Sequence, residues 1–230
     1  MVSMSDDVLP GIGVAALLGG AVGLWCSRWL RSQAYRYEDE LELRTRRVGW
    51  VVPACALLPV LLVLARPDQL PLVAVQSVAA IALVVLGAID IDVFRLPDMI
   101  TYPLVAGVMV GLLGAALVAD DVDAWVRALL AGLALGGFYL ILVLIGGGAG
   151  MGLGDAKLAP SLGMLLGHLS WGHVLLGSIV AFLLAAVAAV YLVVFTGAGR
   201  KSHLAFGPYL VAGTLLVLVA PALGHLVPEI

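Results

Sequence analysis

The segment PLVAVQSVAAIALVVLGAIDI, residues 71–91, decides the fold class. It carries no charged residue before Asp90, and about 20 consecutive apolar residues are enough to cross the hydrocarbon core of a bilayer as a helix. In the whole chain 63% of the residues are hydrophobic and 12% are charged, against roughly 25% charged residues in soluble domains. The sequence therefore predicts an integral membrane protein.

Apolar stretches of this kind recur along the whole chain, and they predict an all-α fold: a polytopic membrane helix bundle of about eight transmembrane helices. We expect one membrane-embedded domain over residues 1–230. The only sizeable polar stretch, residues 31–48, is interpreted as a short charged cytoplasmic loop with Arg and Tyr near the lipid headgroups. The expected spans are 8–29, 49–65, 71–91, 99–119, 124–146, 157–169, 173–195 and 206–226.

The positive residues predict the orientation of these spans, because Lys and Arg concentrate on the cytoplasmic side of a membrane protein. Only two of the twelve, Arg66 and Arg127, lie at even-numbered connections. We therefore expect the N- and C-termini outside and the odd-numbered connections in the cytoplasm. The residues at those odd-numbered connections are Arg28, Arg31, Arg36, Arg44, Arg46, Arg47, Arg95, Lys157, Arg200 and Lys201.

Carboxylates gather at two of these predicted cytoplasmic connections. Asp90 and Asp92 end the third span, Asp98 precedes the fourth, and Asp155 lies in the fifth connection. A carboxylate in or near hydrocarbon costs a few kcal/mol or more, so it calls for a reason. Two carboxylates that face each other oppose each other's ionisation and titrate as one unit. Such a pair can activate a water with one member and polarise a peptide carbonyl with the other, as in aspartic proteases.

Helical geometry separates the roles of these aspartates. Residues two apart on a helix point about 200° away from each other, so Asp90 and Asp92 cannot both face Asp155. Asp90 directly follows the apolar run and is expected to lie deeper, whereas Asp92 is interpreted as a solvated interfacial charge. Asp98 follows Pro97 and precedes an apolar run, which favours a helix N-cap over a direct chemical role.

The glycine-rich stretch GGGAGMGLGD, residues 146–155, fits neither the phosphate-binding loop nor the dinucleotide-binding spacing. Its glycines either allow close helix packing and a tight turn, or let backbone and substrate peptide approach Asp155 at Gly152 and Gly154. Lys157 is interpreted as an anchor that reaches towards the interface. Cys26 and Cys55 form no CxxC pair and are interpreted as packing residues.

Three stretches resemble the signatures of the bacterial type IV prepilin peptidases. IDIDVFRLPD (89–98) with MITYPLV (99–105) resembles their first signature. GLGDAKLAPSLGMLLG (152–167) is similar to their second, the GxGD motif shared in outline with presenilin-type intramembrane aspartic proteases. LAFGPYLVAG (204–213) resembles the start of the family's last span. The resemblance implies that Asp90 and Asp155 are the catalytic pair.

The resemblance also implies a function. It predicts a multi-pass aspartic endopeptidase of the bacterial cytoplasmic membrane that removes the short positively charged leader from prepilin or pseudopilin precursors, at the cytoplasmic face, for a type IV pilus or protein secretion. Besides the substrate, membrane lipid is the expected partner; no cofactor, metal or nucleic acid is expected. Residues expected to shape the site around the catalytic pair are Gly152, Gly154, Lys157, Asp98 and Pro97.

The chain departs from its larger relatives at one point. They carry two CxxC pairs, linked to zinc and to N-methylation of the new terminus, in the first cytoplasmic connection, whereas residues 31–48 contain no cysteine. We therefore expect a peptidase without N-methyltransferase activity. The alternatives are a proton-coupled membrane transporter, which would place polar groups near mid-span, and a membrane scaffold without catalysis.

Overall fold

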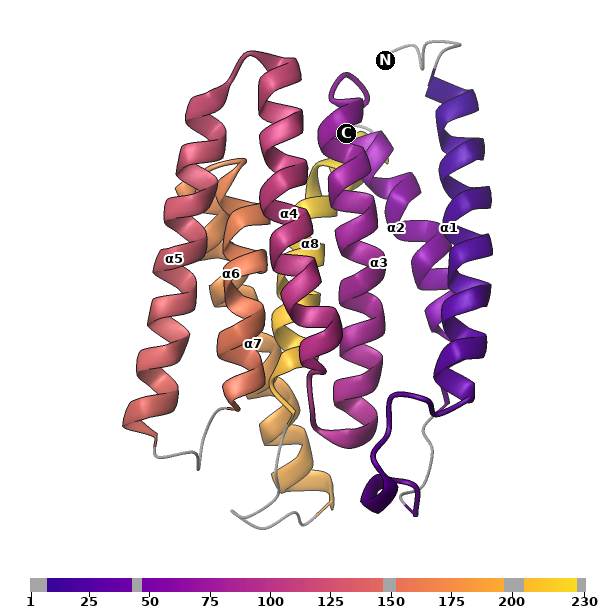
Figure 1. The fold of residues 1–230 in the computed structure, drawn as a ribbon, viewed down its shortest axis with the longest axis vertical. Helices are drawn as coiled ribbons and strands as arrows, with labels where there is room; N and C mark the ends of the chain where they lie inside the picture. The colour runs from indigo at the N-terminus through magenta and orange to yellow at the C-terminus, as the bar shows by residue number, and fades with distance from the viewer. Residues whose placement is uncertain (1–7, 43–46, 147–151, 197–204, 227–230) are drawn as a thin grey trace.

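The structure, a computed structural model, describes residues 8–42, 47–146, 152–196 and 205–226, which form an all-helical bundle (Figure 1). Each of the eight expected spans coincides with one helix, so the predicted fold class is confirmed. A 3-10 turn, η1 (Glu38–Glu40), lies in the first connection. The helices are α1 (Val8–Arg31), α2 (Val51–Ala65), α3 (Leu70–Val93), α4 (Asp98–Ala119), α5 (Val122–Ile145), α6 (Leu153–Gly167), α7 (Trp171–Thr196) and α8 (Gly207–Leu226).

Five of the described helices, α1, α3, α4, α5 and α7, are long and apolar enough to cross a membrane. The apolar helix α2 and the apolar part of α8 are shorter, and α6 has 15 residues. Long apolar helices in this number are typical of membrane-spanning proteins and not of soluble domains. The chain is therefore a multi-pass membrane protein.

Successive helices alternate in direction, which sorts the connections onto two ends of the bundle (Figure 1). The C-terminal ends of α1, α3, α5 and α7 share one end of the bundle, drawn at the bottom of Figure 1 and called the lower end here. The last turn of α3 and the first turns of α6 and α8 lie at this end. The positive residues Arg44, Arg46, Arg200 and Lys201, used to predict the orientation, lie outside the described residues.

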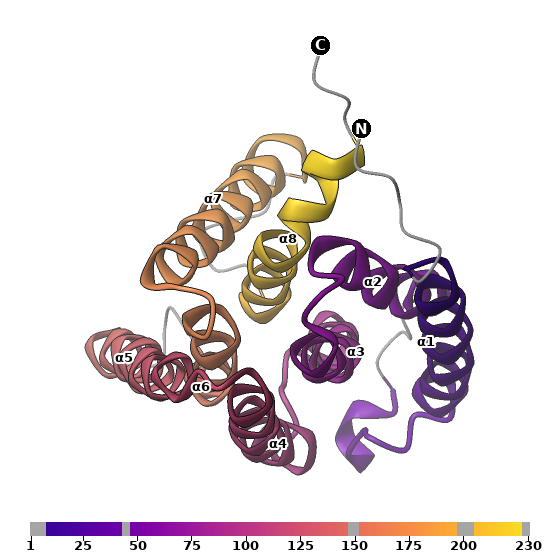
Figure 2. The ribbon, with the colours of Figure 1, turned by 90° about the horizontal axis from the view of Figure 1, so that it is seen from above.

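Helix α3 runs through the interior of the bundle. In its most apolar stretch 67% of the residues are buried, against 17% in α1 and 11% in α7. Seen from above, α1, α5 and α7 lie at the periphery, whereas α3 and α8 lie nearer the centre (Figure 2). Helix α3 packs against α2, α4 and α8, and α8 also packs against α6. These contacts bring the lower ends of α3, α6 and α8 together.

Glycines hold α6 tightly against α5. A Cβ on Gly163 would lie 2.6 Å from the carbonyl oxygen of Ala131, and one on Gly132 would lie 2.7 Å from Cγ of Met164. Helices that pack through small residues bring their backbones close together, as is common in membrane proteins. This contact fixes the position of α6, and with it the first turn that carries Asp155.

Candidate active site

Asp90 and Asp155 lie at the lower end of the bundle, on two different helices. Asp90 is in the last turn of α3, and Asp155 is in the first turn of α6. Each is only 5% exposed. Sixty-five positions of sequence separate them, and the packing of α3 and α6 around α8 brings them to one place.

Gly207, the first residue of α8, lies between the two carboxylates. A Cβ added to Gly207 would lie 2.5 Å from Oδ2 of Asp90 and 3.2 Å from Oδ1 of Asp155. One methyl-sized space is therefore bordered by both carboxylates at once, and only glycine leaves it open. Gly207 lies in the stretch LAFGPYLVAG, but nothing in a single sequence distinguishes it from other glycines at helix starts.

Opposing influences act on this pair of carboxylates. Burial and the proximity of a second carboxylate disfavour two negative charges. In the other direction, Asp155 lies in the first turn of α6, and the backbone amide of Gly207, at the start of α8, interacts with Asp90; helix N-termini favour negative charge. Oδ2 of Asp90 has no hydrogen-bond partner among the described residues. The arrangement suits a pair of carboxylates that holds one proton.

Asp92 is not a solvated charge, so this expectation is wrong. Its Oδ2 accepts hydrogen bonds from Nη2 of Arg36 at 2.7 Å, Nε of Arg36 at 3.0 Å and the hydroxyl of Tyr35 at 2.5 Å. The side chains of Arg36 and Asp92 are 0% and 1% exposed. Tyr35 and Arg36 of the first connection thus cover Asp92, which no local pattern reveals. Burial, together with the bond to Asp92, raises the pKa of Tyr35 to about 12.

A second ion pair docks the same segment onto the connection between α3 and α4. Nη2 of Arg95 lies 2.8 Å from Oε2 of Glu40 and donates to the carbonyl oxygen of Tyr35 at 2.9 Å. The guanidinium of Arg95 also lies over the Tyr37 ring, 3.8 Å from its centroid, where the ring face attracts the cation. The hydrogen bond from Arg95 lowers the pKa of Glu40. Two arginines, Arg36 from the first segment and Arg95 from the second, thus link residues 35–40 to residues 92–95.

The two glycines of the GxGD stretch have different surroundings. Gly152 is the N-cap residue of α6 with extended backbone, and a Cβ on it would lie 3.8 Å from Oδ2 of Asp155. A Cβ on Gly154 would lie 3.2 Å from Cβ of Leu96, which is tighter than ordinary contact. Gly154 therefore lets the α3–α4 connection lie directly against α6.

Asp98 does not cap its helix, so this expectation is also wrong. Pro97 occupies the N-cap position of α4 and Asp98 is the first helical residue. The carboxylate of Asp98 instead accepts hydrogen bonds from Nζ of Lys157 at 2.8 and 2.9 Å. Asp98 lies one position past the N-cap, and a cation from α6 lies within reach of its carboxylate. Lys157 thereby connects the start of α4 to α6, in addition to lying near the end of the bundle.

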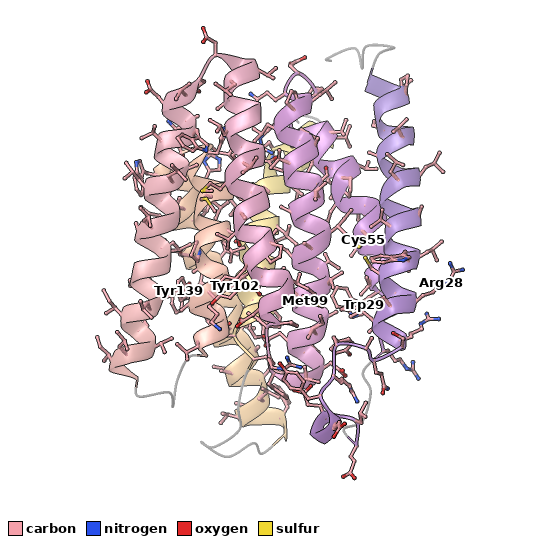
Figure 3. The ribbon with its side chains drawn as sticks, in the orientation of Figure 1. Arg28, Trp29, Cys55, Met99, Tyr102 and Tyr139 are labelled. Atoms are coloured by element: carbon pink, nitrogen blue, oxygen red, sulfur yellow. The ribbon has the colours of Figure 1, made fainter. Side chains whose placement is uncertain are left out.

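Tyr139 on α5 is a further polar residue near the carboxylates that the sequence did not single out. It is 0% exposed. Its ring stacks on Phe182 with centroids 6.1 Å apart and contacts Phe206, the neighbour of Gly207, at 6.2 Å. The charge of Asp155 acts on its hydroxyl, which has no hydrogen-bond partner among the described residues. Figure 3 shows Tyr139 in the lower half of the bundle, as it does Tyr102 of α4.

Two apolar grooves open on the outside of the bundle beside the helices that carry the carboxylates. A groove of about 600 Å³ runs between α3 and α4, and one of about 350 Å³ runs between α5 and α6. The first begins near Met99, which Figure 3 labels in the lower half of the bundle, and the second passes Ala156 and Lys157. Within the described residues, no group of three or more His, Cys, Asp or Glu side chains is placed to hold a metal ion.

Comparison with known proteins identifies a family model and several proteins that are similar to this chain. The family model described as the type IV leader peptidase family matches residues 77–194, a range that includes Asp90 and Asp155. The prepilin leader peptidase/N-methyltransferases of Aeromonas salmonicida (strain A449) and Aeromonas hydrophila are each 34% identical to the chain over 138 residues. That region is 59% of this chain and 46% of each relative, so the match spans a little under half the length of these relatives. No solved structure matches the chain.

Proposed function

The chain belongs to the type IV leader peptidase family, and we propose that it is an aspartic endopeptidase that removes the leader peptide from prepilin or pseudopilin precursors. The observation that carries this proposal is the space at Gly207, which is bordered by the buried carboxylates of both Asp90 and Asp155. Two carboxylates around one small space are the arrangement that water activation and carbonyl polarisation require. The printed names of the Aeromonas relatives supply the substrate class.

The proposed reaction uses one proton shared by the pair. The ionised carboxylate takes a proton from a water molecule, whose oxygen forms a bond to the carbonyl carbon of the scissile peptide. The protonated carboxyl group donates a hydrogen bond to the carbonyl oxygen, which takes up the electron pair of the broken π bond. When the tetrahedral intermediate collapses, the C–N bond breaks and the leaving amine takes a proton from the pair.

We place the lower end of the bundle on the cytoplasmic side of the bacterial cytoplasmic membrane. The positive residues Arg28, Arg31, Arg36 and Arg95 support this side, since all lie at connections that share the lower end. The hydrophobic segment of a membrane-inserted substrate would then lie beside the bundle, where apolar grooves run along α3–α4 and α5–α6, the helix pairs that include the carriers of the two carboxylates.

The remaining residues predicted from sequence are proposed to shape the site rather than to react. Gly152 keeps the approach to Asp155 free of a side chain. Gly154 allows the Leu96 contact, and Pro97 and the Asp98–Lys157 ion pair hold the start of α4 against α6. None of these groups is required to exchange a proton in the reaction.

We further propose that this chain works as a peptidase without methyltransferase activity and with no cofactor or metal. The support is the composition of residues 31–48, which hold no cysteine. Cys26 and Cys55 are buried free thiols within α1 and α2. The relatives' names include N-methyltransferase, so this proposal separates the chain from them. Incubation with a cleaved substrate and a labelled methyl donor would show no labelled product if it holds.

Co-expression with a prepilin-like substrate tests the peptidase proposal. We expect the wild-type chain to produce the shorter, processed form, and Asp90→Asn or Asp155→Asn to abolish processing while the protein still inserts, because Asn cannot share a proton with its partner. Processing by both single variants would contradict the two-carboxylate assignment. A proton-coupled transporter would give no processing with any variant; no observation in the structure favours it, since the buried pair lies at one end of the bundle.

A further inference from the structure

Four buried side-chain atoms in the described residues lack a hydrogen-bond partner. One is Oδ2 of Asp90, in the last turn of α3, and another is the hydroxyl of Tyr139 on α5, which Figure 3 labels in the lower half of the bundle. Burying a polar group without a partner is unfavourable, and native structures contain few such groups. Oδ2 of Asp90 borders the space at Gly207, where the proposed reaction uses it. The hydroxyl of Tyr139 has no role in the reaction proposed above, so it needs its own explanation.

The surroundings of Tyr139 hold its ring in place, whereas its hydroxyl has no hydrogen-bond partner among the described residues. The ring stacks on Phe182 at 6.1 Å and contacts Phe206 at 6.2 Å, and Phe182 and Phe206 lie 5.2 Å apart. Phe206 is followed directly by Gly207, which borders both carboxylates. The aromatic cluster therefore joins Tyr139 to the residue that shapes the space between Asp90 and Asp155, and it fixes the ring without using the hydroxyl.

We propose that Tyr139 is a further catalytic residue, whose hydroxyl donates a hydrogen bond to the oxygen of the scissile carbonyl as that oxygen gains negative charge. This inference rests on the proposed peptidase function. In the addition step the water proton goes to the ionised carboxylate and the oxygen–carbon bond forms. The electron pair of the carbonyl π bond moves to the oxygen, which is held by the protonated carboxyl group and by Tyr139. Tyr139 keeps its own proton throughout.

A fixed donor of this kind stabilises the transition state because it is already oriented when the charge develops. The desolvation cost of this donor is incurred already in the resting protein, where the hydroxyl has no hydrogen-bond partner among the described residues. A residue kept for stability would behave differently, since loss of a structural hydrogen bond destabilises the fold. Removal of this hydroxyl should therefore lower activity without lowering stability.

The test compares wild-type chain, Tyr139→Phe and Tyr191→Phe, each purified in detergent with a prepilin-like substrate. We expect Tyr139→Phe to lower kcat by about 10²-fold and to leave KM within about twofold of the wild-type value. The midpoint of thermal unfolding should stay unchanged or rise, because phenylalanine keeps the ring contacts and removes the buried hydroxyl. Tyr191, an exposed residue of α7 that stacks on Phe195, is the matched control, and Tyr191→Phe should leave all three quantities unchanged.

The outcomes separate this inference from the function on which it rests. If the wild-type chain cleaves the substrate and Tyr139→Phe cleaves it at the same kcat, the role of Tyr139 is overturned. The peptidase function is then unaffected. A fall in the unfolding midpoint that accompanies the loss of cleavage would assign the hydroxyl a structural role and also overturn it. A wild-type chain that cleaves no precursor would overturn the peptidase function itself.

Discussion

Arg36 and Asp92 form an ion pair of 2.7 Å whose two side chains are almost completely buried. Asp92 lies two residues beyond Asp90 on α3, so the two side chains point about 200° apart around the helix axis. Holding Asp92 against the first connection therefore turns Asp90 to the opposite side, where Gly207 and Asp155 lie. The polar segment beneath the bundle thus helps to set the orientation of a candidate catalytic carboxylate.

The first prediction concerns the loss of this ion pair. Arg36→Ala leaves the carboxylate of Asp92 buried without its cation, which typically costs about 3–5 kcal/mol. We expect a large fall in the free energy of unfolding, measured by thermal or denaturant unfolding in detergent, together with loss of cleavage. The double variant Arg36→Met with Asp92→Leu should recover much of the stability, because it leaves no buried charge. Equal stability of Arg36→Ala and wild type would contradict the buried pair.

The second prediction concerns the space between the carboxylates. Gly207→Ala places a methyl group against Oδ2 of Asp90, at a separation of 2.5 Å before relaxation, so the carboxylates must move. Misplacement of reacting groups by about 1 Å can cost about 10²-fold in rate, and we expect at least that loss in kcat. Gly114→Ala is the control, because a Cβ there meets nothing within 4 Å, and it should cleave like wild type. Full activity of Gly207→Ala would show that the space is not used.

The third prediction concerns Lys157 and Asp98. Their ion pair is partly exposed, at 34% and 54% of the two side chains, and exposed pairs contribute about 0–1 kcal/mol. We expect Lys157→Ala and Asp98→Ala to change the unfolding midpoint slightly and kcat by no more than a few-fold. Kinetics of both single variants and the double variant would measure this. Loss of cleavage as complete as that of Asp155→Asn would instead give one of these residues a chemical role.

The fourth prediction concerns pH. The hydrogen bond from Arg95 lowers the pKa of Glu40 in the folded protein. The resulting stabilisation is complete above the unfolded-state pKa of roughly 4.3, and it is lost as the pH falls through the lower folded-state pKa. We expect the unfolding midpoint of the wild type to fall more steeply than that of Glu40→Gln as the pH is lowered from about 6 to about 3. Parallel curves for the two proteins would mean that the pair contributes nothing.

Much of the fold could be predicted from the sequence because the bilayer imposes one strong local rule. Every span needs a long apolar run, and these runs mark the eight helices with small errors at their ends. Helical periodicity also predicted correctly that Asp90 and Asp92 face different surroundings. These features depend on residues that are neighbours in sequence.

The features that the sequence did not reveal depend on contacts between distant segments. Asp92 is paired with Arg36, 56 positions away, and Asp98 with Lys157, 59 positions away, so local patterns assigned both aspartates wrong roles. The place of Gly207 beside the carboxylates likewise follows from how α8 packs on α3 and α6, and Tyr139 is brought near by the packing of α5 on α6. Neither residue has a neighbouring motif that specifies such a contact.

The most direct test of the account is whether the side chains at positions 90 and 155 meet. Asp90→Cys with Asp155→Cys, in a chain with Cys26→Ala and Cys55→Ala, would be oxidised mildly in membranes, then denatured in SDS so that every free thiol is accessible, and treated with a thiol-reactive polyethylene glycol. We predict an intramolecular disulfide that protects both thiols, so that the gel mobility of the protein does not change unless a reductant is added first. In the control pair, Val110→Cys with Asp155→Cys, both thiols should remain fully reactive. Two freely reactive thiols at positions 90 and 155 would contradict the paired carboxylates on which the proposed reaction depends.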